Sequence, residues 1–154
     1  MEHKQLLTVF NSLPVGIGFF TADGTLVRCN ESFCRIFGAD SQTLLGNELN
    51  INENSVVPDV VKEAVRRCVP VQMSFLYDFD KQRTDKRFFS TRTRTCYLKC
   101  NGNPLYDNDG KFVNYIFIFE DITETVKSEE VLRQSRRKTE LAMKAANIMF
   151  WEFD

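Results

Sequence analysis

A chain of 154 residues with 43% hydrophobic and 27% charged residues is long enough for one globular domain with a continuous core. Its formal net charge is −1, so it lacks the basic field that recruits nucleic acid or an anionic membrane surface. The five cysteines form no CxxC pair, and the sequence has neither a secretory leader nor an apolar run of roughly 18 residues. We therefore expect a cytoplasmic protein with reduced thiols, no nucleic acid partner and no direct membrane contact, although a longer parent with a membrane anchor stays compatible.

The N-terminal segment predicts a short amphipathic helix over residues 1–12 that caps the domain. Its apolar positions recur at helical spacing and are Leu6, Leu7 and Phe10. A β-hairpin should follow over residues 15–29, because Asp23-Gly24 separates two strand-like runs and glycine accepts the positive φ of a hairpin turn. Asn30 is then a suitable N-cap, and Gly38 a suitable C-terminal stop, for a second short helix.

A polar loop and an amphipathic helix should come next. Residues 47–55 are polar and rich in asparagine, which indicates a loop or a single turn. Residues 56–68 have apolar and charged positions at helical periodicity, so this helix should cover one face of a sheet. Its apolar stripe consists of Val57, Val60, Val61, Ala64 and Cys68.

Two long strands should follow that helix. Residues 71–80 alternate between apolar and polar side chains, which is the period of a strand with one buried face. Residues 81–86 are charged and predict a hairpin tip. The inward residues of the next strand are Cys96, Leu98 and Cys100. Pro104 should end the hydrogen-bonded ladder of that strand, because proline has no backbone N–H.

The last strand, Val113 to Glu120, follows a turn at Asp109-Gly110 and is apolar on both faces. Both faces should therefore be covered. The face that should line the core carries Tyr115, Phe117 and Phe119. We expect the other face to pack against the N-terminal helix or a second copy of the protein. The predicted homodimer face consists of Leu6, Leu7, Phe10, Ile116 and Ile118.

The end of this strand should pass almost directly into a helix. Asp121 stands where an N-cap would stand, with Glu124 three residues later as in a capping box. The signal junction predicted here consists of Asp121, Ile122 and Thr123. Residues 123–146 are highly charged, without glycine or proline, which predicts a long helix of weak heptad character. Residues 147–154, NIMFWEFD, align with GIGFFTAD at residues 16–23 and should form the first strand of a truncated second domain.

The order of these elements and four local motifs resemble the PAS domains of sensor proteins. The motifs are GFFTADGTLVRCN at residues 18–30, NESFCRIFG at residues 30–38, NPLYDNDGKFV at residues 103–113 and EDIT at residues 120–123. They are similar to the first hairpin, the Asn-x-x-Phe-x-x-x-x-Gly helix, the Pro-x-x-Asp-x-x-Gly turn and the Asp-Ile-Thr end motif of that family. The resemblance covers roughly residues 3–123.

The resemblance implies an α+β PAS fold, in which a five-stranded antiparallel sheet carries helices on one face. An N-terminal amphipathic helix should precede the PAS domain at residues 13–122, and a long C-terminal signalling helix should follow it. The implied function is a sensory and dimerisation module, the input domain of a bacterial two-component sensor histidine kinase in a phosphorelay. Two alternatives stay open: a ligand-free dimerisation platform, and the input domain of a cyclic-dinucleotide cyclase or phosphodiesterase.

The sequence predicts neither catalysis nor a redox cofactor within this chain. It contains no Ser/His/Asp set, HExxH motif or phosphate-binding glycine loop. Haem in a PAS domain needs an axial histidine over the sheet, but the one histidine of the sequence is His3. The flavin photosensors of this family carry a reactive cysteine where this sequence has Leu49, so we expect no photochemistry of that kind. No metal site is expected. The cysteines Cys29, Cys34, Cys96 and Cys100 are best interpreted as core residues, with a redox or cluster site as the alternative.

A ligand pocket, if one forms, should lie between the helices and the inward strand faces. Its predicted residues are Met73, Phe75, Tyr77, Leu98, Cys100, Tyr115, Phe117 and Phe119. These faces offer no cation, so we expect a small apolar or aromatic ligand rather than an anionic one. The alternative is that the phenylalanines of the chain fill this space themselves.

Overall fold

The structure, a computed structural model, describes residues 2–83 and 90–152. The chain divides into two compact units between Asp121 and Ile122. The first unit contains the sheet with its helices, and the second contains the C-terminal helix. Among the described residues, none of the helices combines the length and the apolar character that crossing a bilayer requires.

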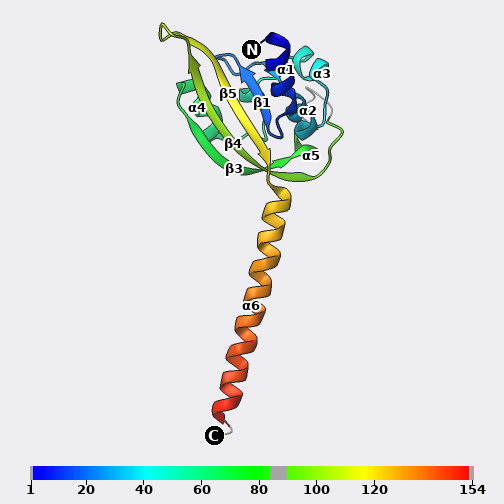
Figure 1. Cartoon of the computed structure of the whole chain (residues 1–154), viewed down its shortest axis with the longest axis vertical. Coiled ribbons are helices and arrows are strands. Elements are labelled where there is room, and N and C mark those ends of the chain that lie inside the picture. The colour runs from blue at the N-terminus through cyan, green and yellow to red at the C-terminus, as the bar shows by residue number, and fades with distance from the viewer. Residues whose placement is uncertain (1, 84–89, 153–154) are drawn as a thin grey trace. The chain divides into compact units, whose positions relative to one another are not determined.

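One antiparallel sheet of five strands forms the centre of the first unit, in the order β2-β1-β5-β4-β3 (Figure 1). The strands are β1 Gly16–Phe20, β2 Leu26–Cys29, β3 Val71–Asp78, β4 Thr95–Tyr106 and β5 Phe112–Asp121. The C-terminal strand β5 is therefore central, between the N-terminal strand β1 and β4. This arrangement confirms the predicted α+β fold with a five-stranded antiparallel sheet.

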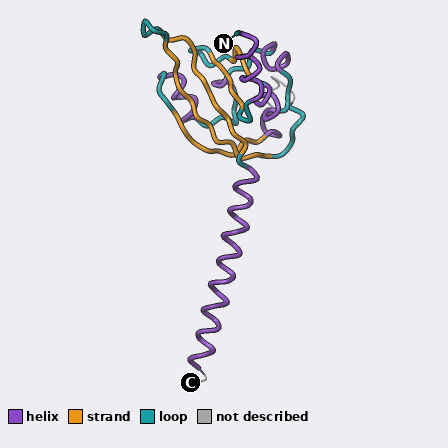
Figure 2. Tube along the Cα trace, in the orientation of Figure 1, coloured by secondary structure: helices purple, strands orange, loops and turns teal. Residues whose placement is uncertain are grey.

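The helices lie before β1, between β2 and β3, between β3 and β4, and after β5 (Figure 2). They are α1 His3–Ser12, α2 Glu31–Phe37, α3 Ser41–Gly46, the 3₁₀ helix η1 Ile51–Glu53, α4 Asp59–Arg67, α5 Phe79–Gln82 and α6 Thr123–Glu152. The single turn η1 lies in the asparagine-rich segment, as predicted. The predicted N-terminal helix is also confirmed.

Local signals fix the ends of α2 and the tips of two hairpins. The Asn30 side chain accepts a hydrogen bond from the Phe33 N–H at 3.0 Å, and Gly38 ends the helix in the left-handed region with φ 67°. Gly24, with φ 90°, lies in the β1–β2 turn, and Gly110, with φ 78°, lies in the β4–β5 turn. A side chain at any of these three glycines would be strained, which explains why the turn signals predicted the correct places.

The core lies on one face of the sheet, beneath α2 and α4. Tyr115 and Phe117 of β5 have no exposed surface, and the inward residues of β4 are equally buried. Gly102 of β4 allows this packing, since a Cβ there would lie 2.5 Å from the Phe117 ring and 2.8 Å from the Tyr115 ring. Phe37 of α2 contacts the Phe119 ring edge to face, with centroids 5.3 Å apart. The predicted inward face of β5 is therefore confirmed.

Three boundaries in the middle of the chain differ from the predictions. Helix α4 begins at Asp59, and Val60 is 63% exposed instead of contributing to the apolar stripe. The predicted hairpin tip begins inside α5, and its residues 84–86 lie outside the described residues. Pro104 does not end the β4 ladder, because β4 still pairs with β5 there. The last β3 partner is Gly102, so Pro104 lies where β4 has one neighbour and tolerates a missing donor.

The C-terminal strand predicted at residues 147–154 is not formed. Residues 147–152 continue helix α6, and residues 153 and 154 lie outside the described residues. A lone strand leaves its backbone N–H and C=O groups without partners, whereas a helix satisfies them within the segment. Residues 147–152 therefore satisfy these groups as a continuation of α6.

Candidate functional site

A cavity of about 60 Å³ lies between the inner face of the sheet and the helices α2, η1, α4 and α5. Its lining residues are Phe20, Leu26, Phe33, Phe37, Leu49, Asn50, Ile51, Glu53, Asn54, Val57, Val61, Phe75, Tyr77, Gln82 and Phe119. A cavity that holds benzene in a protein core measures about 150 Å³. A ligand of benzene size therefore needs side chains to move aside.

Three of the eight predicted pocket residues line this cavity: Phe75, Tyr77 and Phe119. The other five, Met73, Leu98, Cys100, Tyr115 and Phe117, are not among its lining residues. Four of these are fully buried and fill the core, and Met73 is half-buried against it. Much of the space expected for a ligand is thus occupied by the chain's own aromatic rings.

One wall of the cavity is formed by the segment from Leu49 to Asn54, which was not among the predicted pocket residues. This segment is joined to the β1–β2 hairpin, because the Leu26 N–H donates to the Leu49 carbonyl at 2.7 Å and the Ile51 N–H donates to the Gly24 carbonyl at 2.8 Å. Its many asparagines were the available signal, since they bond backbone groups that no strand or helix satisfies.

The cavity has a polar edge as well as aromatic walls. The Asn54 amide donates to the Tyr77 hydroxyl at 2.9 Å. Gln82 of α5, only 1% exposed, brings a second carboxamide to the lining. Both groups are neutral, and Glu53, the charged residue of the lining, is exposed.

The carboxylate of Asp121, at the end of β5, is held by Arg92. Arg92 donates to Asp121 Oδ2 at 3.1 Å and to the Ile36 carbonyl of α2 at 2.9 Å. The guanidinium also lies 4.8 Å from the centre of the Phe79 ring. One side chain therefore connects the end of β5 with α2 and α5, both of which contribute residues to the cavity.

The position of Asp121 corrects the predicted helix cap. Asp121 is the last residue of β5, and α6 begins at Thr123. The N-cap position therefore falls on Ile122, whose carbonyl accepts the first helical bond from Val126 at 2.9 Å. One residue separates the central strand from the helix.

The residues of the predicted homodimer face lie on two elements, β5 and α1. Ile116 and Ile118 lie together on the outer face of β5, half-buried and 37% exposed respectively. The leucines expected to cover them do not, since Leu6 is 55% and Leu7 40% exposed. Phe10 is the residue of the predicted face that reaches the sheet, and its ring lies 6.0 Å from that of Phe19.

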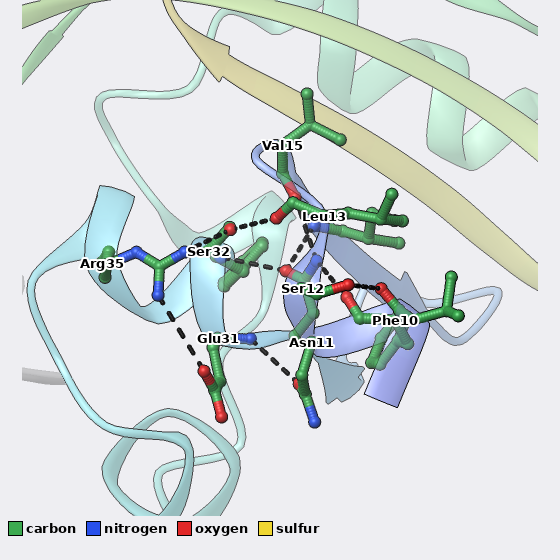
Figure 3. A network of polar contacts seen from close by, with 12 residues as sticks. Phe10, Asn11, Ser12, Leu13, Val15, Glu31, Ser32 and Arg35 are labelled. Carbon is green, nitrogen blue, oxygen red and sulfur yellow. Dashed lines mark hydrogen bonds and ion pairs between the residues drawn. The ribbon is translucent and has the colours of Figure 1, made fainter. Parts of the chain in front are cut away.

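The C-terminal end of α1 is tied to the start of α2 (Figure 3). The Glu31 N–H donates to the Asn11 side chain at 3.2 Å. The Ser32 hydroxyl donates to the Leu13 carbonyl and accepts from Arg35 at 2.7 Å. Since α1 has no buried residue, these bonds are a large part of its attachment.

The cysteines divide into two groups. Cys96 and Cys100 are buried in the core, where burial raises the pKa of each thiol to about 11. Cys29 and Cys34 are half-buried, and their sulfur atoms lie 3.9 Å apart. Among the described residues, no group of three or more potential ligands is placed to hold a metal ion.

The family model described as PAS fold matches residues 10–127, which is more than half of the chain. The chain belongs to the PAS family. No curated protein matches it in sequence. The chain therefore has the fold of a sensory family whose members are generally not catalytic.

Solved structures show the same fold at low identity. An RNA-binding Light-Oxygen-Voltage receptor has 16% identity and a TM-score of 0.64, over 89% of this chain and 38% of that one. A PAS domain protein from Colwellia psychrerythraea has 16% identity and a TM-score of 0.59, over 79% and 97% of the two chains. A PAS domain from a two-component sensor histidine kinase has 14% identity and a TM-score of 0.55, over 77% and 94%. This chain spans well under half of the length of the first of these proteins.

The buried ionisable groups of the PAS core predict a loss of stability at alkaline pH. Burial raises the pKa of Tyr115 from 10.0 to about 12 and those of Cys96 and Cys100 from 9.0 to about 11. Each group ionises first in the unfolded chain, so the stability it contributes is complete below its ordinary pKa and is lost as pH rises through the folded value. Urea unfolding should show a constant free energy up to about pH 9 and a steady fall above it.

The variant Tyr115→Phe tests the contribution of one hydroxyl. It removes the hydrogen bond from Tyr115 to the Val69 carbonyl, at 2.5 Å, and should cost about 1 kcal/mol at pH 7. Its free energy of unfolding should then fall less steeply than that of the wild type above pH 10. The control Tyr106→Phe, at a side chain that is 55% exposed, should leave the curve unchanged. Parallel curves for wild type and Tyr115→Phe would contradict the assignment.

Proposed function

We propose that this PAS domain is the sensory and dimerising input module of a bacterial two-component sensor histidine kinase. In this proposal the protein is cytoplasmic, forms a homodimer, and passes a change at the sheet through α6 to a downstream kinase in the parent chain. The role proposed for the chain itself is sensory rather than catalytic. Residues 147–152 would begin a second PAS domain and become a strand where a following sheet is available to pair with them.

The observation that carries this proposal is the direct connection between β5 and α6. Strand β5 is central and contributes Phe119 to the cavity, and only Ile122 separates it from α6. Arg92 links the end of the same strand to α2 and α5. A change in the cavity that moves α2 or α5 would therefore change how β5 presents Ile122 and Thr123 to the helix.

Asp121→Ala tests this junction in a receptor in which α6 leads into a histidine kinase core. The side chains of Arg92 and Asp121 are 32% and 29% exposed, so their ion pair contributes about 1 kcal/mol or less. The rate of autophosphorylation in Asp121→Ala should therefore differ from that of the wild type by up to about fivefold, while the melting temperature changes little. The matched control is Glu120→Ala, which removes the neighbouring exposed carboxylate and should not alter kinase activity. Equal activity in both variants and the wild type would show that the ion pair is only structural.

We propose that the signal is a small, neutral, mostly apolar or aromatic ligand in the cavity. The aromatic walls favour such a ligand, and the amides of Asn54 and Gln82 can bond its polar edge. Haem and flavin photochemistry are not part of the proposal. The residue at the photosensor cysteine position, Leu49, lines the cavity with an unreactive side chain, and His3 is exposed on α1.

Val57→Phe tests the cavity, because it adds an aromatic ring to a lining residue on the α4 side. Indole should raise the melting temperature of the wild type by about 2–4 °C for each kcal/mol of binding, and benzoate should not. Val57→Phe should abolish the indole shift. The control Val60→Phe adds the same ring on the exposed face of α4 and should keep the shift. Stabilisation by benzoate alone, or an indole shift that survives in Val57→Phe, would contradict the proposal.

A second candidate function is a ligand-free dimerisation platform, which the small volume of the cavity favours. The remaining alternative, the input domain of a cyclic-dinucleotide cyclase or phosphodiesterase, keeps the sensory role of the first proposal and replaces the kinase by another enzyme in the parent chain. In all of them the homodimer should form through Ile116 and Ile118, next to Leu6, Leu7 and Phe10.

Ile118→Glu should weaken the homodimer by about 10- to 100-fold, because it places a charge in an apolar contact. Light scattering after gel filtration, over a range of protein concentrations, measures this change. Val60→Glu introduces the same charge at another exposed apolar position and should leave the dimer intact. Equal dissociation constants for the two variants would place the interface elsewhere.

A further inference from the structure

Two thiols lie in contact at the point where β2 passes into α2. Cys29 is the last residue of β2, and Cys34 lies in the middle of the short helix α2. Their sulfur atoms are 3.9 Å apart, and both residues are half-buried rather than sealed in the core. A disulfide bond is roughly 2.05 Å long, so the two sulfurs must approach each other by about 2 Å to form one.

Such a disulfide would close a covalent ring, and the residues within this ring hydrogen-bond to the C-terminal end of α1. The residues between the two cysteines include Asn30, Glu31 and Ser32. Asn30 donates to the Phe10 carbonyl at 2.9 Å, and the Glu31 N–H donates to the Asn11 side chain at 3.2 Å. Ser32 donates to the Leu13 carbonyl. Three consecutive residues thus hold the C-terminal end of α1, and one cysteine stands on each side of them.

We propose that Cys29 and Cys34 are an oxidative modification site, at which hydrogen peroxide forms an intramolecular disulfide that loosens α1 from α2. The shift of α2 toward β2 that closes the sulfur gap would act directly on the backbone between them. Since α1 has no buried residue, the loss of one of these bonds weakens a substantial part of its attachment. This proposal does not depend on the kinase or ligand proposals above.

The chemistry balances with one molecule of peroxide. The thiolate of one cysteine attacks a peroxide oxygen, the O–O bond breaks, and the leaving hydroxide takes a proton to become water. The second thiol then attacks the sulfur of the sulfenic acid, forms the S–S bond and releases a second water. The two thiols lose two electrons in total, and peroxide is reduced to two waters.

Cys34 is the expected first nucleophile. Burial raises the pKa of Cys29 to about 12, which leaves little thiolate at neutral pH. Burial also raises the pKa of Cys34, and the nearby carboxylates of Asp40 and Glu31 add to the rise, whereas the hydrogen bond with Cys29 and the charge of Arg35 oppose it. Because both thiols are mostly protonated, the reaction should need sustained oxidation and proceed over minutes to hours.

The test treats the whole chain with hydrogen peroxide, blocks the remaining thiols and maps the peptides without reduction. The wild type should yield a cross-linked Cys29–Cys34 peptide that dithiothreitol removes. In the oxidised protein, hydrogen exchange at the Glu31 N–H and in α1 should accelerate about five- to tenfold, the factor expected from one lost hydrogen bond. Cys68→Ser, at the third half-buried cysteine, should behave like the wild type, whereas Cys34→Ser should show neither effect.

Two results would overturn the proposal. Absence of the Cys29–Cys34 cross-link in wild-type protein, under conditions that oxidise Cys68 or an added dithiol peptide, would show that the pair is not a modification site. A cross-link without faster exchange at Glu31 and α1 would show that the ring does not control the attachment of the helix. Both measurements use the wild-type protein, so they test the proposal even if a serine variant fails to fold.

Discussion

The Asn30 side chain forms hydrogen bonds to three segments: the end of α1, the start of β1 and the start of α2. Its oxygen accepts hydrogen bonds from the Ile17 N–H at 2.8 Å and from the Phe33 N–H at 3.0 Å. Its nitrogen donates to the carbonyls of Phe10 at 2.9 Å and Val15 at 3.0 Å. The side chain is 1% exposed, and all four of its hydrogen-bonding positions are used. The start of β1, the start of α2 and the end of α1 are placed by this one residue, and a buried amide with any bond missing would be costly.

That attachment decides how α2 lies on the sheet, and α2 in turn determines the cavity. Phe33 and Phe37 project from α2 toward the inner face, and both line the cavity beside Phe119 of β5. At its other end, α2 offers the Ile36 carbonyl to Arg92, which also binds Asp121. The short helix therefore contacts the attachment of α1, the cavity and the end of β5. The proposed ligand response and the proposed output through α6 both rest on these contacts.

The cavity is small because the core is filled with aromatic rings. The rings of Phe37, Tyr77 and Phe119 pack edge to face or stacked on their neighbours, with centroids 5.3 to 5.5 Å apart. Such contacts stabilise the core, and a ligand that opens the cavity must replace some of them. The same packing that favours a stable, nearly filled domain therefore restricts the proposed ligand to one that offers comparable apolar contact. The two proposed functions, ligand sensing and ligand-free dimerisation, therefore differ in whether a ligand offsets the free energy of moving these rings.

The amino-acid sequence by itself determined the features that depend on residues a few positions apart. Asn30 and Gly38 mark the ends of α2, and Asp109-Gly110 marks the last hairpin, because caps and turns are satisfied within the segment itself. The pleat of β5 likewise placed Tyr115, Phe117 and Phe119 together on one face, although both faces of the strand are apolar.

Only the tertiary structure decided the contacts between distant segments. The cavity wall at residues 49–54, the ion pair of Arg92 with Asp121 and the contact of Cys29 with Cys34 each depend on how separate elements pack. The same reason accounts for the two ends of the chain. Leu6 and Leu7 of α1 were expected to lie with Ile116 and Ile118 but are exposed, and residues 147–152, expected to begin a strand, continue α6. Periodicity shows that a face is apolar, whereas what covers that face depends on surfaces that local sequence does not specify.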